Sequence, residues 1–176
     1  MSRKKRHSKL EYFQRNAAGE YIYTGEHMSY VSTEKSRKCL LLELWVLGIA
    51  GTVCLLLCGF LPLQSFLGCF YVLLPYIVAL IAAFSCLWTI GELAGGGDPL
   101  RQYVHDATVL KLPGRAMVSA VAALACILGE IVFCILNGAD GTVGVLAAFF
   151  LLIAIGTAAM VLLYRCIRGA VWQITG

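Results

Sequence analysis

The segment GGGDPLRQYVHD, residues 95–106, has the residue types that could perform chemistry at a surface. Phosphate-binding loops place their glycines between a strand and a helix, with a Lys-Ser/Thr end or a GxGxxG spacing. This segment has neither feature and follows a long apolar run. His105 and Asp106 could form an acid–base pair, but neighbouring residues of a helix point in different directions. We therefore expect no catalytic residue and no cofactor. An enzyme that acts on lipid headgroups through Asp98, His105 and Asp106 is the alternative.

Glu130 lies inside an apolar run, where an ionised carboxylate is costly unless it is paired, protonated or hydrated. No Lys or Arg occurs at its depth in any apolar run. Pro75 has no N–H to donate to the Tyr71 carbonyl, which releases a hydrogen-bond acceptor. One interpretation is a neutral glutamic acid that bonds to Tyr71, Tyr76, Thr52 or the released carbonyl and fixes helix register. The other is a proton or cation site for transport.

Two further carboxylates, Glu43 and Glu92, lie close to the ends of apolar runs. Basic residues flank the same ends, so interfacial ion pairs explain both acids without a functional role. The expected cationic partners are Arg37, Lys38, Arg101 and Arg115.

Cys54 and Cys58 are one helical turn apart, and two thiolates could bind a soft metal ion such as Cu(I) or Zn²⁺. No histidine or third ligand accompanies them, and the sequence has no CxxC motif. We therefore expect no metal site and assign most cysteines to helix packing.

Four apolar runs must position all of these residues. The chain has 176 residues, of which 60% are hydrophobic and 14% charged, with a mean hydropathy of +0.80. Each run approaches the ~20 residues that cross a ~30 Å hydrocarbon layer. The predicted spans are 39–60, 66–93, 116–136 and 143–164. The predicted fold is an all-α membrane protein, a four-helix transmembrane bundle of two hairpins, 39–93 and 116–164.

The distribution of lysine and arginine predicts the orientation, because translocated short loops rarely carry them. All 14 of these residues lie in 1–38, 94–115 or 165–176, and the short turns between paired spans have none. Both termini and the central loop are therefore expected in the cytoplasm of a multi-pass plasma-membrane protein, such as one of the bacterial inner membrane. The basic segment RKKRHSK suits anionic lipid headgroups better than nucleic acid.

Two small cytoplasmic elements are predicted outside the membrane. Residues 11–31 alternate aromatic and polar residues around NAAG and TGEH, as in a β-hairpin or three-stranded meander. An isolated two-stranded hairpin is only marginally stable, so we expect this one to pack against the central loop, the membrane or another protein. In the central loop, Asp98 suits an N-cap and Pro99 a first helical residue. An amphipathic helix on the inner leaflet, ended by Pro113, follows.

Small and polar residues mark the expected packing faces of three spans, because small residues let membrane helices approach closely. These residues are Ser119, Ala123, Cys126, Glu130 and Asn137 on the third span, Glu43, Ala50, Cys54 and Cys58 on the first, and Gly144, Ala148, Ala154 and Ala158 on the fourth. We expect the three faces to pack together.

The sequence shows no serine-histidine elbow, HExxH motif or acidic cluster for phosphoryl transfer. We therefore expect a noncatalytic scaffold or accessory subunit of a membrane complex. Its partners would be membrane lipids, including anionic headgroups, and another membrane protein or a second copy, with no nucleic acid. The alternative is a small oligomeric transporter or channel that uses Glu130.

Overall fold

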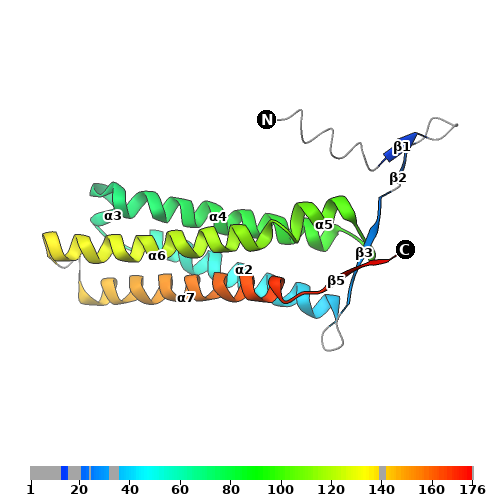
Figure 1. Cartoon of the computed structure of the whole chain (residues 1–176). Coiled ribbons are helices and arrows are strands. Elements are labelled where there is room, and N and C mark those ends of the chain that lie inside the picture. The colour runs from blue at the N-terminus through cyan, green and yellow to red at the C-terminus, as the bar shows by residue number, and fades with distance from the viewer. Residues whose placement is uncertain (1–12, 16–20, 24, 32–35, 139–141, 176) are drawn as a thin grey trace.

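The computed structural model describes residues 13–15, 21–23, 25–31, 36–138 and 142–175. Four long helices form a bundle, and a small β-sheet lies against one end of it (Figure 1). The long helices are α2 (Arg37–Gly59), α4 (Phe70–Gly95), α6 (Leu112–Asn137) and α7 (Val143–Arg168). Each is long and apolar enough to cross a membrane, so the predicted four-helix bundle is confirmed.

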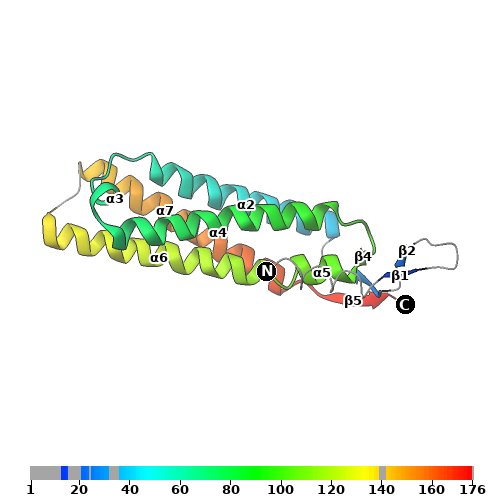
Figure 2. The ribbon, with the colours of Figure 1, turned by 90° about the horizontal axis from the view of Figure 1, so that it is seen from above.

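The two helical hairpins, α2 with α4 and α6 with α7, lie side by side in the bundle (Figure 2). α4 packs against α6 and α2 packs against α7, so every long helix has two long neighbours. We call the end that carries the sheet the sheet end. The opposite end, where the short helix α3 (Ser65–Gly68) lies, is the turn end.

Two helix starts differ from the predicted spans for local reasons. α4 begins at Phe70, because Cys69 before it has extended backbone and separates it from α3. α6 begins at Leu112, ahead of Pro113, which lies in its first turn. A proline is well tolerated there, since the first helical N–H groups have no intrahelical acceptor. Pro113 therefore opens α6 and does not end the helix before it.

The amino-terminal strands form two separate antiparallel pairings. β1 (Phe13–Arg15) pairs with β2 (Tyr21–Tyr23), with Gln14 opposite Ile22, as the predicted hairpin requires. β3 (His27–Tyr30) does not continue this hairpin. It is the central strand of a second sheet, between β4 (Leu100–Arg101) and β5 (Trp172–Thr175).

This second sheet joins three distant segments of the chain at the sheet end. Met28 pairs with Leu100 on one side and with Ile174 on the other. The amino-terminal region therefore leans on the central loop, as expected, and also on the carboxy-terminal tail. The sequence interpretation left that tail, 165–176, without a strand.

The central segment contains the expected short helix, but with other bounds and another environment. α5 (Gln102–Thr108) begins after Arg101, so Asp98 is not its N-cap. Leu100 and Arg101 are strand residues, because pairing with β3 supplies their backbone hydrogen bonds. His105, predicted on the polar side of the helix, is buried against the bundle and sheet. The helix thus packs on protein along the face that carries its histidine.

Candidate functional site

Glu130 on α6 is wholly buried, with 0% of its surface exposed. The Cys134 thiol, one turn further along α6, donates to Glu130 Oε1 over 3.9 Å. The preceding residue, Gly129, touches α4, where an added Cβ would lie 2.8 Å from the Tyr71 carbonyl oxygen. The α6 segment that carries Glu130 therefore lies directly beside the Tyr71 backbone.

The two tyrosines expected near Glu130 lie in different surroundings. Pro75 lies inside α4 and gives no N–H to the Tyr71 carbonyl. The Tyr71 side chain is 45% exposed on the outside of the bundle. The Tyr76 hydroxyl donates to the Leu55 carbonyl at 3.0 Å and so joins α4 to α2. The hydroxyl hydrogen of Tyr76 is therefore directed to α2.

The polar stripe of α6 continues along the contact with α4. Ser119, Ala123 and Cys126 are buried with Glu130. The Ser119 hydroxyl donates to the Ala79 carbonyl at 2.9 Å, which crosses from α6 to α4. Asn137 lies apart from this stripe, exposed at the end of α6, and donates to the Phe133 carbonyl at 3.3 Å.

The predicted small-residue faces of α2 and α7 are wrong in part. Ala50 on α2, and Gly144, Ala154 and Ala158 on α7, are exposed, while Cys54 and Ala148 are half-buried. The close approach uses Gly51 and Gly156 instead, since a Cβ on either would be 3.4 Å from the carbonyl oxygen of the other. Glycine permits this contact because it has no side chain to hold the two backbones apart. The predicted faces of α2 and α7 therefore lie to one side of the surfaces through which the two helices are in contact.

Two arginines near the sheet end donate hydrogen bonds to α4. Arg37 Nη2 donates to the Leu93 and Gly96 carbonyls at 3.3 and 3.2 Å, and Nη1 lies 3.8 Å from Asp98 Oδ2. Arg115 Nη1 donates to the Ser85 carbonyl and to the Thr89 hydroxyl. These arginines join α2 and α6 to α4. Arg37 reaches carbonyls at the end of α4, which have no intrahelical donor, whereas Arg115 reaches groups inside α4.

The predicted ion pairs of Glu92 do not form with these arginines. Glu92 Oε1 accepts a hydrogen bond from the Trp88 indole N–H at 3.1 Å. Arg101 instead lies over the Tyr23 ring, with its Cζ 5.5 Å from the ring centroid. Lys38 is exposed, and Glu43 is half-buried beside Arg165 in a groove between α2 and α7.

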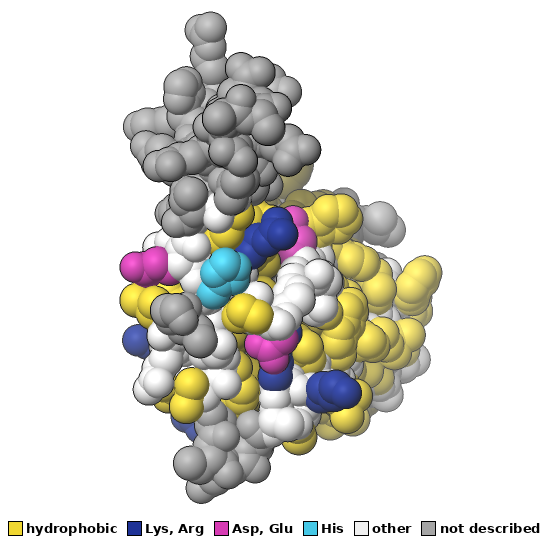
Figure 3. Space-filling model, turned by 90° about the vertical axis from the view of Figure 1, so that its right-hand side faces the viewer, with side chains coloured by type: hydrophobic (Ala, Val, Ile, Leu, Met, Phe, Trp, Pro, Cys, Tyr) yellow, Lys and Arg dark blue, Asp and Glu magenta, His cyan; other side chains and the backbone are white. Residues whose placement is uncertain are grey.

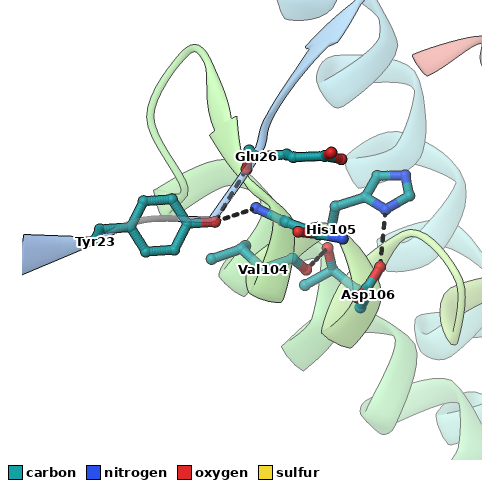
Figure 4. A network of polar contacts seen from close by, with 7 residues as sticks. Tyr23, Glu26, Val104, His105 and Asp106 are labelled. Carbon is teal, nitrogen blue, oxygen red and sulfur yellow. Dashed lines mark hydrogen bonds and ion pairs between the residues drawn. The ribbon is translucent and has the colours of Figure 1, made fainter. Parts of the chain in front are cut away.

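Tyr23 fixes the base of the β1–β2 hairpin to the central segment (Figure 4). Its hydroxyl donates to the Glu26 carbonyl at 3.0 Å and accepts from the Gln102 N–H at 2.9 Å. Its ring makes edge contacts with Tyr103 on α5 and with His27 on β3. One side chain thus connects the hairpin, the second sheet and the central segment.

Trp172 on β5 holds the other side of the sheet. Its ring centroid lies 5.5 Å from that of Tyr30 and 5.6 Å from that of His105. His105 Nδ1 is 3.3 Å from Asp106 Oδ1, so the two adjacent residues do meet. Viewed from the sheet end, charged and histidine side chains gather on this surface and hydrophobic ones dominate the flank (Figure 3).

The described His, Cys, Asp and Glu side chains are spread over the bundle and the sheet end. Within the described ranges, no three His, Cys, Asp or Glu side chains are placed to hold a metal ion. His105 is 9% exposed and packed between protein groups. Its ring lies against Trp172 of β5, and its Nδ1 faces the neighbouring Asp106.

Two features of the structure, β5 at the sheet end and the Gly129 contact beside Glu130, were missed in the sequence. The alternation WQIT after Gly169 is a short strand signal, and it could have indicated β5. Gly129 has no comparable signal. The close helix contact that a glycine inside a helix permits can be recognised only when the neighbouring backbone is known.

Four long apolar helices and a small sheet at one end define this chain as a multi-pass membrane protein with four candidate spans. No family model matches the chain, and neither the curated proteins nor the solved structures give a match.

Proposed function

We propose that this protein is a noncatalytic membrane component that presents the β1–β2 hairpin to a partner protein at the cytoplasmic surface. The observation that carries the proposal is the Tyr23 contact, which ties the hairpin base to the Gln102 backbone and the Tyr103 ring. Hairpins of two strands are marginal alone, so a hairpin held in this way gains a defined position. Its strand edges offer backbone groups for pairing with an added strand.

The proposed orientation rests on the position of the basic residues. The described lysines and arginines belong to the hairpin, to the segments next to the sheet end, or to the first and last turns of helices there. Short segments rich in these residues stay in the cytoplasm. A plasma-membrane protein of a bacterial cell with the sheet end inside agrees with this distribution.

Site-specific photocrosslinking in native membranes tests the proposal. A photoreactive residue replaces Gln14 on β1 in the full-length protein, and one at Leu128, 64% exposed on α6, serves as the control. We expect position 14 to give one discrete protein adduct, and Tyr23→Ala to reduce its yield severalfold without unfolding the bundle. An adduct whose yield is unchanged by Tyr23→Ala, or lipid adducts alone, would contradict the proposal.

The same experiment identifies the kind of partner. An adduct of twice the mass of the chain indicates a second copy, while any other mass indicates a different membrane or cytoplasmic protein. Tyr23→Phe separates two contributions, because it keeps the ring contacts with Tyr103 and His27 and removes the hydroxyl bonds. We expect an intermediate yield from this variant.

A second candidate function is proton- or cation-coupled transport, favoured by the wholly buried carboxyl of Glu130. A carboxyl at such a position is a default site for proton or ion exchange in membranes. Proteoliposomes with Glu130→Gln should lose pH-driven flux, while Glu92→Gln, a matched change at an exposed site, should retain it. Flux that persists in Glu130→Gln would exclude this role.

A further inference from the structure

A groove of about 620 Å³ opens between α4 and α6 towards the sheet end. One wall is formed by Val78, Ile81 and Ala82 of α4, and the other by Gly114 and Val118 of α6. Its volume is within the range of about 300–1,000 Å³ that ligand sites in proteins occupy. The walls lie on candidate membrane spans, so the groove faces the acyl chains of the bilayer.

The mouth of this groove is basic. Lys111, exposed just before α6, and Arg115, in its first turn, line the mouth. Arg115 is fixed there by the bonds of its Nη1 to the Ser85 carbonyl and the Thr89 hydroxyl. Both bonds use one nitrogen, so the N–H groups of Nε and Nη2 are available to an anion. The positive end of the α6 dipole lies at the same place.

The mouth also lies at the depth of lipid headgroups. Arg115 bonds to residues on both sides of Trp88, a 72% exposed tryptophan that donates to Glu92. Exposed tryptophans on spans are enriched at the level where hydrocarbon meets headgroups. From Arg115 to Asn137, at the other end of α6, the helix rises roughly 33 Å, close to the ~30 Å hydrocarbon thickness.

From this combination we propose that the α4–α6 groove is a binding site for an anionic phospholipid. An acyl chain lies along Val78, Ile81 and Val118, and the phosphate is bound by Lys111 and Arg115. Basic pockets between spans are the kind of site that selects anionic headgroups. The inference is independent of the hairpin, since none of these residues belongs to β1 or β2.

Gly114 provides a direct way to test the site. A Cβ built on Gly114 meets no atom within 4 Å, so a larger side chain there enters open space beside the groove. Gly114→Phe should therefore fold and obstruct the acyl chain. Gly91→Phe on α4 is the matched control, because Gly91 also has open space and does not line this groove.

The headgroup contact is tested by Lys111→Gln, with Lys38→Gln as its control. Both lysines are exposed near the sheet end, but Lys38 lies on α2 and lines no part of this groove. A lysine or arginine near an anionic surface contributes enough to change affinity roughly fivefold. Arg115 is left intact, because its removal would also remove two hydrogen bonds that join α6 to α4.

Native mass spectrometry of the full-length protein in detergent measures lipid binding directly. We expect phosphatidylglycerol to bind in preference to phosphatidylcholine with the same acyl chains. Lys111→Gln should weaken phosphatidylglycerol binding roughly fivefold and leave phosphatidylcholine unchanged. Gly114→Phe should weaken the binding of both lipids, while both control variants should behave as the unmodified chain.

Several results would overturn the proposal. Lys111→Gln and Lys38→Gln could have equal effects, or Gly114→Phe could leave lipid binding intact. Competition by soluble glycerol phosphate as strong as that by the lipid would indicate a site for free phosphate. Loss of a dimer in Gly114→Phe would assign the groove to a second copy of the chain.

Discussion

Gly129 on α6 lies so close to the Tyr71 carbonyl oxygen on α4 that an added Cβ would be only 2.8 Å from that oxygen. The same carbonyl is the one to which Pro75 gives no N–H. A proline in α4 and a glycine in α6 therefore shape one helix crossing. Glu130 is carried into the bundle interior by the helix turn that makes this contact.

Gly129→Ala should destabilise the bundle by about 1–3 kcal/mol, because backbone atoms would have to move to accept the methyl group. Gly91→Ala is the matched control, since its Cβ would meet nothing within 4 Å. Unfolding of both variants in mixed micelles by SDS gives the comparison. Equal stability of the two variants would show that the Gly129 contact is looser than the structure has it.

Gly59→Ala should also destabilise, because a Cβ at position 59 would overlap the Tyr76 hydroxyl. Tyr76→Phe alone should cost about 0.5–1.5 kcal/mol through loss of the bond to the Leu55 carbonyl. In the double variant the alanine should cost less, since the hydroxyl is gone. A double-mutant cycle measures this coupling, and strict additivity of the two changes would contradict it.

The spans could be predicted from the sequence because about 20 consecutive apolar residues have few other stable environments. The stripe of Ser119, Ala123 and Cys126 was found for a related reason, since helical geometry fixes which residues share a face. Which face of α2 and α7 is buried could not be found in this way. Ala50 and Gly51 are adjacent small residues, and only the partner helix decides between them.

The sheet end was harder to predict because its strands are short and their partners are distant in the chain. Leu100 and Arg101 carry a plausible helix signal, with Asp98 and Pro99 before them. Pairing with β3 determines their conformation instead. At such positions, pairing with a distant strand overrides the local helix propensity.

Trp172→Ala should loosen the second sheet, because the indole contacts both Tyr30 and His105. We expect faster proteolysis of the segment before α2, with the bundle itself intact. Trp88→Ala is the control, since that tryptophan is exposed on α4 and donates to Glu92 on the same helix. Limited proteolysis followed by mass analysis of the fragments measures the effect. Equal cleavage rates in the two variants would show that Trp172 does not stabilise the second sheet.

Arg37 should contribute more to stability through backbone carbonyls than through its carboxylate partner. Asp98 is largely exposed, with 60% of its side chain accessible, and its Oδ2 is 3.8 Å from Arg37 Nη1. Exposed pairs of this kind contribute about 0–1 kcal/mol. The bonds of Nη2 to Leu93 and Gly96 involve a charged donor in a part-buried site, worth about 1.5–3 kcal/mol.

Asp98→Asn should therefore change the free energy of unfolding by under about 1 kcal/mol, while Arg37→Gln should cost about 1–3 kcal/mol. Arg37→Lys should resemble the glutamine variant, because an ammonium lacks the planar fork that directs Nη2 to two carbonyls and Nη1 to Asp98 at once. SDS unfolding of the three variants measures these differences. A loss in Asp98→Asn as large as that in Arg37→Gln would mean that the carboxylate, and not the end of α4, anchors the start of α2.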